Sequence, residues 1–244
     1  MNNQLSIKSG QNLKIFAENN TQKTVVFPVK NAKNVAIQIH AEENSQLDVY
    51  TIFKGESSMK MDFDIQKNAT VSVFHLTKNA EFSQNDIDIT LSGENANFEL
   101  YGLIFGSENQ HHHCQSKIIH AVPNCTSREL VKTILSDKSH CVFDGLVLVK
   151  KDAQKTDSQM TNRNLLLSDN AKIKTNPQLE IYADDVKCSH GATSGQLDSE
   201  ALFYFRSRGI SEKDALQLLI SGFAGEILEK IKDEEVKQMM SEKQ

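Results

Sequence analysis

The sequence predicts a mainly β protein, with a β-solenoid over residues 1–197 and a helical region over residues 198–244. Short alternating or β-branched segments recur through the first region, and short polar turns separate them. Three prolines in 244 residues suit sheets that cannot lose many N–H donors. From about residue 198 the apolar residues recur at helical spacing instead.

The strand patterns are clearest in seven segments, residues 24–29, 34–40, 46–53, 70–76, 97–105, 141–149 and 178–182. Five turns share the dipeptide Asn-Ala, at residues 31–32, 68–69, 79–80, 95–96 and 170–171. Asn tolerates the left-handed conformation that a sharp corner needs. Repeated corners of one chemistry favour stacked rungs, each buried only against its neighbours. A double-sheet jelly roll is the alternative, because short irregular repeats do not distinguish the two folds.

The helical region begins near Asp198, and Gly209 is placed to end its first helix. Ser211 and Asp214 form a capping-box-like start of a second helix. Its apolar positions at helical spacing are Leu216, Leu219, Ile220, Phe223, Ile227 and Ile231, widened by Leu218 and Leu228. This face is expected either to cap the end of the solenoid or to bind another protein. Residues 233–244 are expected to form a weaker helix or to fray.

Charge and cysteine usage exclude several classes of protein. The chain has 27 basic and 32 acidic residues and no long basic run, so nucleic-acid or anionic-membrane binding is not expected. Its four cysteines include no C-x-x-C, so neither a zinc knuckle nor a small disulfide framework is predicted. The N-terminus shows no apolar segment of a signal peptide, and no run of about 18 apolar residues occurs. These observations predict a reduced cytoplasmic protein.

The most informative stretch is NPQLEIYADDVKCSHGATSGQLDSEALFYFRSRGI, residues 176–210. Cys188 and His190 follow an apolar-alternating strand, and side chains two apart on a strand share one side. Thiolate and imidazole are ligands that iron chemistry favours. From these residues alone the commoner interpretation is a buried thiol beside a histidine at a strand end. The small residues 191–195 would let another backbone approach closely.

Other histidines and cysteines are interpreted as structural or incidental. In the tract HHHC, residues 111–114, only His111 with His113, or His112 with Cys114, could converge on a strand, and a solvated surface with weak metal affinity is expected. A structural role is expected for His120, Cys125, His140 and Cys141. The chain contains no nucleophile elbow, phosphate-binding glycine loop or H-E-x-x-H, so no enzymatic activity is predicted.

Three matched segments together resemble the SufB/SufD family of the SUF iron–sulfur cluster assembly system. They are HAVPNCTS (120–127), residues 142–195 and LFYFRSRGISEKDALQLLISGF (202–223). The pattern is closer to the SufD branch, because the SufB branch carries a cysteine just before its Leu-Leu strand. This chain has TNRNLLLS there, at residues 161–168, with no cysteine. The resemblance implies a right-handed parallel β-helix followed by C-terminal helices.

The resemblance also implies a non-catalytic scaffold subunit that pairs with a SufB-like subunit. The family's functional histidine falls on His190 and its neighbouring cysteine on Cys188, where iron or an iron–sulfur cluster would be held transiently at the SufB–SufD interface. The helices would dock a SufC-like ABC ATPase through residues Ser211, Ala215, Leu218, Leu219 and Phe223. No cofactor is expected to bind the isolated chain tightly, and reduced flavin is considered only for the complex. A homodimer is the open alternative to the SufB pair.

Two functions of other classes remain as alternatives. A self-assembling structural β-solenoid without a cluster role would polymerise through its ends. A β-helix enzyme acting on polysaccharide would need aromatic platforms for sugar rings. Aromatic residues are only 7% of this chain and Trp is absent, so the enzyme is disfavoured.

Overall fold

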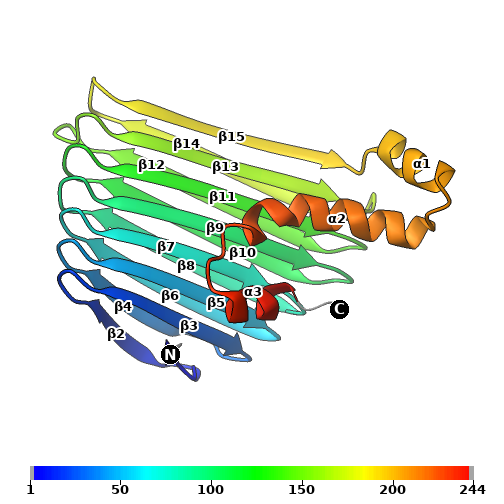
Figure 1. Cartoon of the computed structure of the whole chain (residues 1–244), viewed down its shortest axis with the longest axis horizontal. Helices are drawn as coiled ribbons and strands as arrows, with labels where there is room; N and C mark the ends of the chain where they lie inside the picture. The colour runs from blue at the N-terminus through cyan, green and yellow to red at the C-terminus, as the bar shows by residue number, and fades with distance from the viewer. Residues whose placement is uncertain (1–2, 242–244) are drawn as a thin grey trace.

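The computed structural model describes residues 3–241. The predicted solenoid and helical regions extend to residues 1 and 244, so residues 1–2 and 242–244 of these predictions lie outside the described part. Two parallel sheets wind into a β-solenoid, and three helices follow (Figure 1). Every strand pair is parallel, which confirms the β-helix prediction and excludes the jelly-roll alternative. The last strand ends at Gln196 and the first helix begins at Ser199.

Successive strands alternate between the two sheets. The eight-stranded sheet contains, in spatial order, β1 (Asn3–Gln4), β3 (Gln22–Lys30), β5 (Gln46–Lys54), β7 (Thr70–Thr77), β9 (Asn97–Gly106), β11 (Thr126–Leu135), β13 (Asp157–Leu166) and β15 (Lys187–Gln196). The seven-stranded sheet contains, in the reverse order, β14 (Lys172–Ile181), β12 (His140–Val149), β10 (His111–His120), β8 (Phe82–Leu91), β6 (Glu56–Ile65), β4 (Val35–Ala41) and β2 (Asn12–Ala17). Neighbouring strands pair residue for residue, so each inward side chain stacks on an inward side chain of the next rung.

Several strands were not evident from the sequence. β6, β8 and β10 alternate regularly between buried and more exposed positions, and β11 and β13 do so over their first halves, but the inward positions of β8, β10, β11 and β13 include polar residues. A stacked rung can bury serine, asparagine or histidine on its inner face when neighbouring rungs supply hydrogen bonds. An apolar-alternation criterion misses such strands for that reason.

Asparagine corners turn the chain between the sheets. Four of the five predicted Asn-Ala corners hold Asn at positive φ, namely Asn31, Asn68, Asn79 and Asn95, with φ of 51–59°. The prediction for Asn170 is wrong, because this residue is not left-handed, although the Ala171 N–H donates to the Ser168 carbonyl at 3.3 Å as the corresponding N–H groups do at the Asn68 and Asn95 corners. Successive corner amides also bond each other: Asn68 Nδ2 donates to Asn44 Oδ1 at 2.9 Å, and Asn95 Nδ2 to Asn68 Oδ1 at 3.2 Å.

We expect Gly55→Ala to destabilise the solenoid by about 2 kcal/mol. Gly55 has φ +66°, and a Cβ there would lie 1.9 Å from Asn31 Oδ1, which accepts the Glu56 N–H. Gly222→Ala is the matched control, because Gly222 lies in a helix interior with open space around it, and it should stabilise by about 0.5–1 kcal/mol. Urea denaturation measures both changes; equal midpoints for Gly55→Ala and wild type would contradict the clash.

The helix boundaries follow the predicted caps. Asp198 caps α1 (Ser199–Ser207) by accepting the N–H groups of Glu200 and Ala201, and Gly209 ends this helical turn at φ +81°. Ser211 caps α2 (Glu212–Leu228) by accepting the Asp214 N–H at 3.1 Å. A third helix, α3 (Glu234–Ser241), forms near the C-terminus. None of the helices in the described part combines the length and apolarity needed to cross a membrane.

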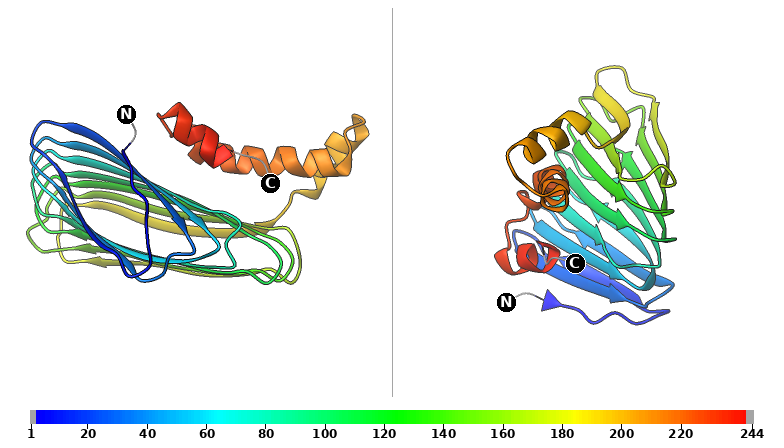
Figure 2. Two further views of the ribbon diagram at one scale, coloured as in Figure 1. Left: turned by 90° about the horizontal axis from the view of Figure 1, so that it is seen from below. Right: turned by 90° about the vertical axis from the view of Figure 1, so that its right-hand side faces the viewer.

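The helical region lies along the outside of the eight-stranded sheet, so the expected cap over the end of the solenoid is wrong (Figure 2). The outer face of this sheet is apolar and includes a stack of Tyr50, Phe74 and Tyr101, with ring centroids 4.9 and 5.2 Å apart. Residues of the C-terminal region complete this cluster: Ala224, Ile227, Ile231 and Val236 are buried against it, and Ile220, Phe223 and Leu228 partly so. Covering this apolar face removes its side chains from water, which stabilises the packing of the helical region on the sheet.

Candidate functional site

Cys188 and His190 lie on β15, the last strand of the eight-stranded sheet. The small residues 191–195, expected to follow the strand, are part of it. Among the described strands β15 pairs only with β13, and no described strand pairs with its other edge. The Lys187 N–H bonds the Thr156 carbonyl at 2.8 Å. Because alternate residues of a parallel strand bond opposite neighbours, the backbone groups of Cys188 and His190 face the open edge.

The register places both side chains on the inner side of the sheet. Cys188 stands opposite Ser158 and His190 opposite Met160, and both partners on β13 are buried inward residues. The expectation that the thiol and the imidazole share one side of the strand is therefore confirmed. Since no further rung covers them, Cys188 is half-buried against the core while His190 is exposed.

Burial raises the pKa of the Cys188 thiol above its ordinary value. A hydrogen bond from the backbone of Ser158 opposes this shift, and the charge of Asp157 adds to it. The protonated thiol is therefore the resting form near neutral pH, and a bound metal ion would have to displace the proton.

The second sheet ends at the same place. β14 pairs only with β12, and its inward residues Leu179 and Ile181 line the open end of the solenoid opposite β15. Ile181 and Tyr182 are among the exposed large apolar residues of the molecule. Two adjacent open edges flanked by apolar side chains are the arrangement that natural proteins normally cover or pair.

Within residues 3–241, no group of three or more His, Cys, Asp or Glu side chains converges in the manner of a metal site. Cys188 and His190 are thus two ligands of an incomplete set. A complete coordination shell for iron would need further ligands from outside this group.

The HHHC tract divides between the two faces of β10. His111 and His113 point outward, and His113 Nε2 lies 3.0 Å from Asp144 Oδ2. His112 and Cys114 are inward and buried, so the expectation of a solvated surface is wrong for these two residues. Of the residues expected to be structural, His120, Cys125 and Cys141 are buried.

Sequence reasoning missed the polar groups of the solenoid interior. Glu129 is only 2% exposed, and its Oε1 accepts the Ser116 hydroxyl proton at 2.7 Å. Burial raises the pKa of Glu129 to about 7, and the Ser116 bond only partly offsets this. The signal was available in the alternation Ser127, Glu129, Val131, in which the carboxyl occupies a position between two inward residues.

The predicted ATPase-docking residues fall on both sides of α2. Ser211 is exposed as the cap, Leu218 is 49% exposed and Leu219 is partly exposed. Ala215 is buried, and the ring of Phe223 lies against the Lys132 ammonium of β11. The predicted docking residues do not include Phe203 and Tyr204 of α1, which are 73% and 56% exposed.

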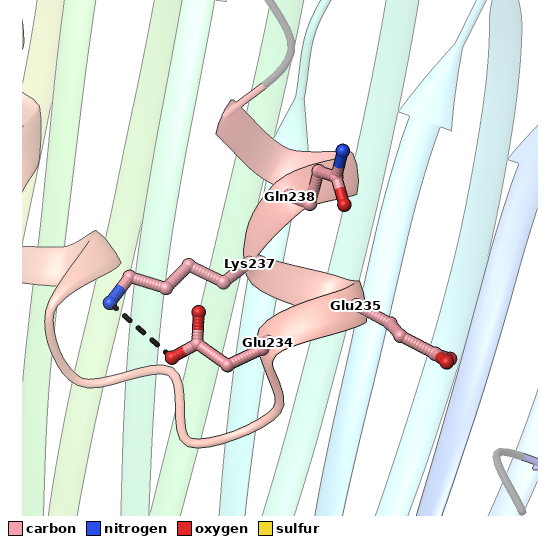
Figure 3. Close-up of a pocket in the computed structure, with 4 residues that line it drawn as sticks. All are labelled: Glu234, Glu235, Lys237 and Gln238. Carbon is pink, nitrogen blue, oxygen red and sulfur yellow. Dashed lines mark ion pairs between the residues drawn. The ribbon is translucent and has the colours of Figure 1, made fainter.

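A hollow of about 460 Å³ lies beside α3, away from β15 (Figures 1 and 3). Its lining residues are Glu234, Glu235, Lys237 and Gln238. Lys237 pairs with Glu234 at 3.9 Å, and Glu235 points away from that pair (Figure 3). The side chains do not converge on a point, so this hollow contributes nothing to the site on β15.

Comparisons with known proteins place this geometry in a family. A family model described as SUF system FeS cluster assembly, SufBD core domain, matches residues 2–223. The iron–sulfur cluster assembly protein SufD of Escherichia coli is 49% identical over 150 residues, which are 62% of this chain and 36% of that protein. A SufBD family protein of Synechocystis is 51% identical over 109 residues, 45% of this chain and 24% of that protein.

A SufBD family protein of Mycobacterium leprae is 38% identical over 157 residues, 61% of this chain and 40% of that protein. The chain thus spans less than half the length of these relatives. The family model covers most of the chain, including all fifteen strands of the described part. The chain therefore belongs to the SufBD family of SUF iron–sulfur cluster assembly proteins.

Proposed function

We propose that this chain is a non-catalytic, cytoplasmic scaffold subunit of a SUF iron–sulfur cluster assembly complex. In this proposal, Cys188 and His190 contribute iron or cluster ligands at an interface with a SufB-like partner. The observation that carries the proposal is their placement: both side chains face inward at the one end of the solenoid where β14 and β15 have open edges. A partner rung laid on this end would enclose them.

The chemistry of the two residues suits a transient site. A thiolate and a neutral imidazole bind iron, but two ligands hold it weakly until the partner adds others. The raised thiol pKa of Cys188 means that iron binding by this thiol releases a proton to solvent. Iron is the cargo here. Reduced flavin, if used, would belong to the complex.

Pairing would proceed by addition of a partner strand at the open edges. The backbone groups of Cys188 and His190 already point outward along β15, and Gly191 and Gly195 have open space where a side chain would lie. Bare backbone at these positions allows a partner strand to approach closely. A second copy of this chain could supply the same edges, so a homodimer is the competing partner.

The exposed apolar residues Phe203, Tyr204 and Leu218 supply the surface for a SufC-like ABC ATPase. They lie on α1 and the first half of α2, with Ser211 and Leu219 nearby in sequence. Aromatic residues on an exposed helical surface are the usual anchors of protein interfaces. The buried Ala215 and the partly buried Phe223 would support this surface from beneath.

Replacement of His190 with Ala should lower the rate of cluster formation by the reconstituted complex at least about tenfold, because one ligand is lost. Cys188→Ser should have a similar effect. Folding and capture of the SufB-like subunit should persist, since His190 is exposed and packs little. His113→Ala, on the outer face of β10, is the matched control and should assemble clusters normally. Normal cluster formation by His190→Ala would reject its assigned role.

Leu218→Asp tests the second interface. We expect it to abolish capture of the SufC-like ATPase in co-purification while capture of the SufB-like subunit continues, because a charge replaces a central apolar contact. Lys150→Asp, in an exposed turn after β12, is the control and should capture both partners. Truncation after Gly209 should behave as Leu218→Asp does. Retention of the ATPase by both variants would place its docking site elsewhere.

The open edges also favour a second candidate, a structural solenoid that assembles end to end. Sedimentation of the isolated chain distinguishes the two. Discrete monomers or dimers agree with the scaffold proposal, whereas concentration-dependent polymers without partner capture favour the structural role.

A further inference from the structure

An ion-pair network lies beneath α2, where the helix crosses the eight-stranded sheet. Lys132 of β11 has a side chain only 4% exposed, and its Nζ lies 2.6 Å from Glu226 Oε2. The same ammonium donates to the Phe223 carbonyl at 2.7 Å and lies 4.8 Å from the centre of the Phe223 ring. A buried ammonium of this kind is retained only where its partners compensate the loss of water. All of these partners come from α2.

Glu226 also binds the next strand. Arg163 Nη1 of β13 donates to the same oxygen, Glu226 Oε2, at 2.9 Å. Lys132 and Arg163 are register partners on neighbouring strands, so one carboxylate of the helix holds two successive rungs. The hydrogen bond from Lys132 lowers the pKa of Glu226, which keeps the carboxylate charged.

This network is one strand away from the candidate site. Arg163 is the register partner of Thr193 on β15, three residues beyond His190. The network therefore links α2 to the strand that supports β15. Apolar contacts are not directional, whereas charge-assisted hydrogen bonds from two cations to one carboxylate require a defined position of α2 on the sheet.

The tail has an anchored part and a projecting part. Residues Ala224, Ile227, Ile231 and Val236 are buried against the sheet. α1 and the beginning of α2 extend past the ends of the strands (Figures 1 and 2). The exposed residues Phe203, Tyr204 and Leu218 belong to this projecting part. Its direction thus depends on how firmly the anchored part is held.

We propose that Glu226 is a positioning residue: by binding Lys132 and Arg163 together, it fixes the direction of the projecting helices relative to β13 and β15. The projecting surface and the strand that carries Cys188 and His190 then move as one body. The structural part of this inference stands alone, and its meaning for cluster assembly rests on the proposed function.

Distances between spin labels test the structural part. Labels at Ser207→Cys on α1 and Lys150→Cys after β12 are introduced in a Cys188→Ser background, where the remaining cysteines are buried. Double electron–electron resonance should give a narrow distribution of label–label distances for the labelled protein that retains Glu226. The distribution should be at least about twice as wide when the labelled protein also carries Glu226→Gln. Glu234→Gln, which removes the ion pair to Lys237 on α3, should leave the distribution narrow. An equally narrow distribution for Glu226→Gln would overturn the proposal.

Arg163→Gln is the second variant, in case Glu226→Gln does not fold. It removes only the more exposed half of the network, and we expect an intermediate width. If Glu226→Gln does not fold, the comparison is between Arg163→Gln and the protein with both residues intact. Equal widths of their distance distributions would then overturn the proposal, because the shared carboxylate would not position the helix.

The functional part is read in the reconstituted complex. Glu226→Gln should capture the SufC-like ATPase as well as wild type does, because the docking residues are intact, yet form clusters about fivefold more slowly. Unchanged cluster formation alongside a widened distribution would reject the link to assembly. Failure of the wild-type chain to capture any ATPase would instead reject the proposed function, and the spin-label result would still decide the structural inference.

Discussion

Lowering the pH from 7 to 4 is expected to lower the free energy of unfolding of this protein by about 6 kcal/mol. This value is the loss caused by three buried histidines minus the gain caused by the buried Glu129. Three histidines are buried inside the solenoid and held in the neutral form. Burial lowers the pKa of His75 to about 3, with the charge of His112 adding to the effect. Burial lowers the pKa of His112 and His120 to about 4.

The sign follows from comparing the folded and unfolded chains. An unfolded histidine takes up a proton near pH 6.5, but these three cannot do so until the pH reaches about 3–4. Between these values the unfolded state binds more protons, so stability falls as the pH falls. Each histidine contributes roughly 3 kcal/mol to that loss by pH 4. Protonation of Glu129 stabilises the folded chain by about as much as one histidine destabilises it. The net loss is therefore about 6 kcal/mol.

The hydrogen bonds explain why these histidines remain neutral. His75 Nδ1 and Nε2 each lie 2.8 Å from a threonine hydroxyl, of Thr51 and Thr77. His112 Nδ1 lies 2.9 Å from Ser83 Oγ, and His120 Nε2 lies 2.9 Å from Ser127 Oγ. Hydroxyl partners pair with both ring nitrogens of His75 but with only one each of His112 and His120, and they supply no negative charge for an imidazolium.

Urea denaturation at a series of pH values between 4 and 7 measures the effect. His112→Asn should reduce the net slope of stability against pH by about one half, since it removes roughly 3 of the 6 kcal/mol of net loss. His113→Asn is the control on the outer face of the same strand. Stability that stays constant between pH 6.5 and 4.5 in the wild type would contradict the assignment of neutral buried histidines.

Glu129→Gln is expected to stabilise the protein by roughly 3 kcal/mol at pH 8, because it replaces a buried carboxylate with a neutral side chain of the same shape. The pKa of Glu129 is about 7 in the folded protein, against 4.5 as its reference value. The folded chain therefore keeps the proton longer as the pH rises. Its stabilising contribution is complete below about pH 4.5 and is lost as the pH rises to about 7.

The measurement compares wild type and Glu129→Gln by urea denaturation at pH 5 and pH 8. The gain should be large at pH 8 and small at pH 5, where the carboxyl of the folded wild type is already protonated. Glu94→Gln, in an exposed turn, is the matched control and should show no such difference. A gain of equal size at both pH values would show that shape or packing, and not charge, decides the effect.

Local chemistry made the corners and caps predictable. Asn31, Asn68, Asn79 and Asn95 adopt the left-handed conformation that their sequence indicated, because that preference belongs to the residue itself. Gly209 and Ser211 end and begin helices for the same kind of reason. Asn170 departs from the pattern: its turn has the same closing backbone hydrogen bond as the Asn68 and Asn95 corners, but its asparagine is not left-handed.

Long-range packing could not be predicted in the same way. The helical spacing of Ile220, Phe223 and Ile227 identified an apolar face of α2, but not the surface that it covers. That surface is the outer face of the eight-stranded sheet, whose apolar residues come from strands spread over more than half of the chain. Strands whose inward residues are polar, such as β10 and β11, were missed because their hydrogen-bond partners come from a stacked strand or from the facing sheet.

The candidate site was half predictable. The spacing of Cys188 and His190 gave their common side, which the register with Ser158 and Met160 confirms. Their exposure at an open edge depends on β15 being the last rung, and only the stacking order of the whole sheet reveals this. The interior acid Glu129 was overlooked because a charged residue in an alternating segment is normally assigned to solvent.

The in-register stacking of rungs has a consequence for how the molecule opens. A stack whose rungs contact only their neighbours frays from its ends, and β15 is held from one side alone. The amide protons of Cys188 and His190, which point along the open edge, should exchange with solvent among the fastest of any strand. A strand added by a partner would slow that exchange, so the same two residues that are proposed to bind iron would also report when the edge has been sealed.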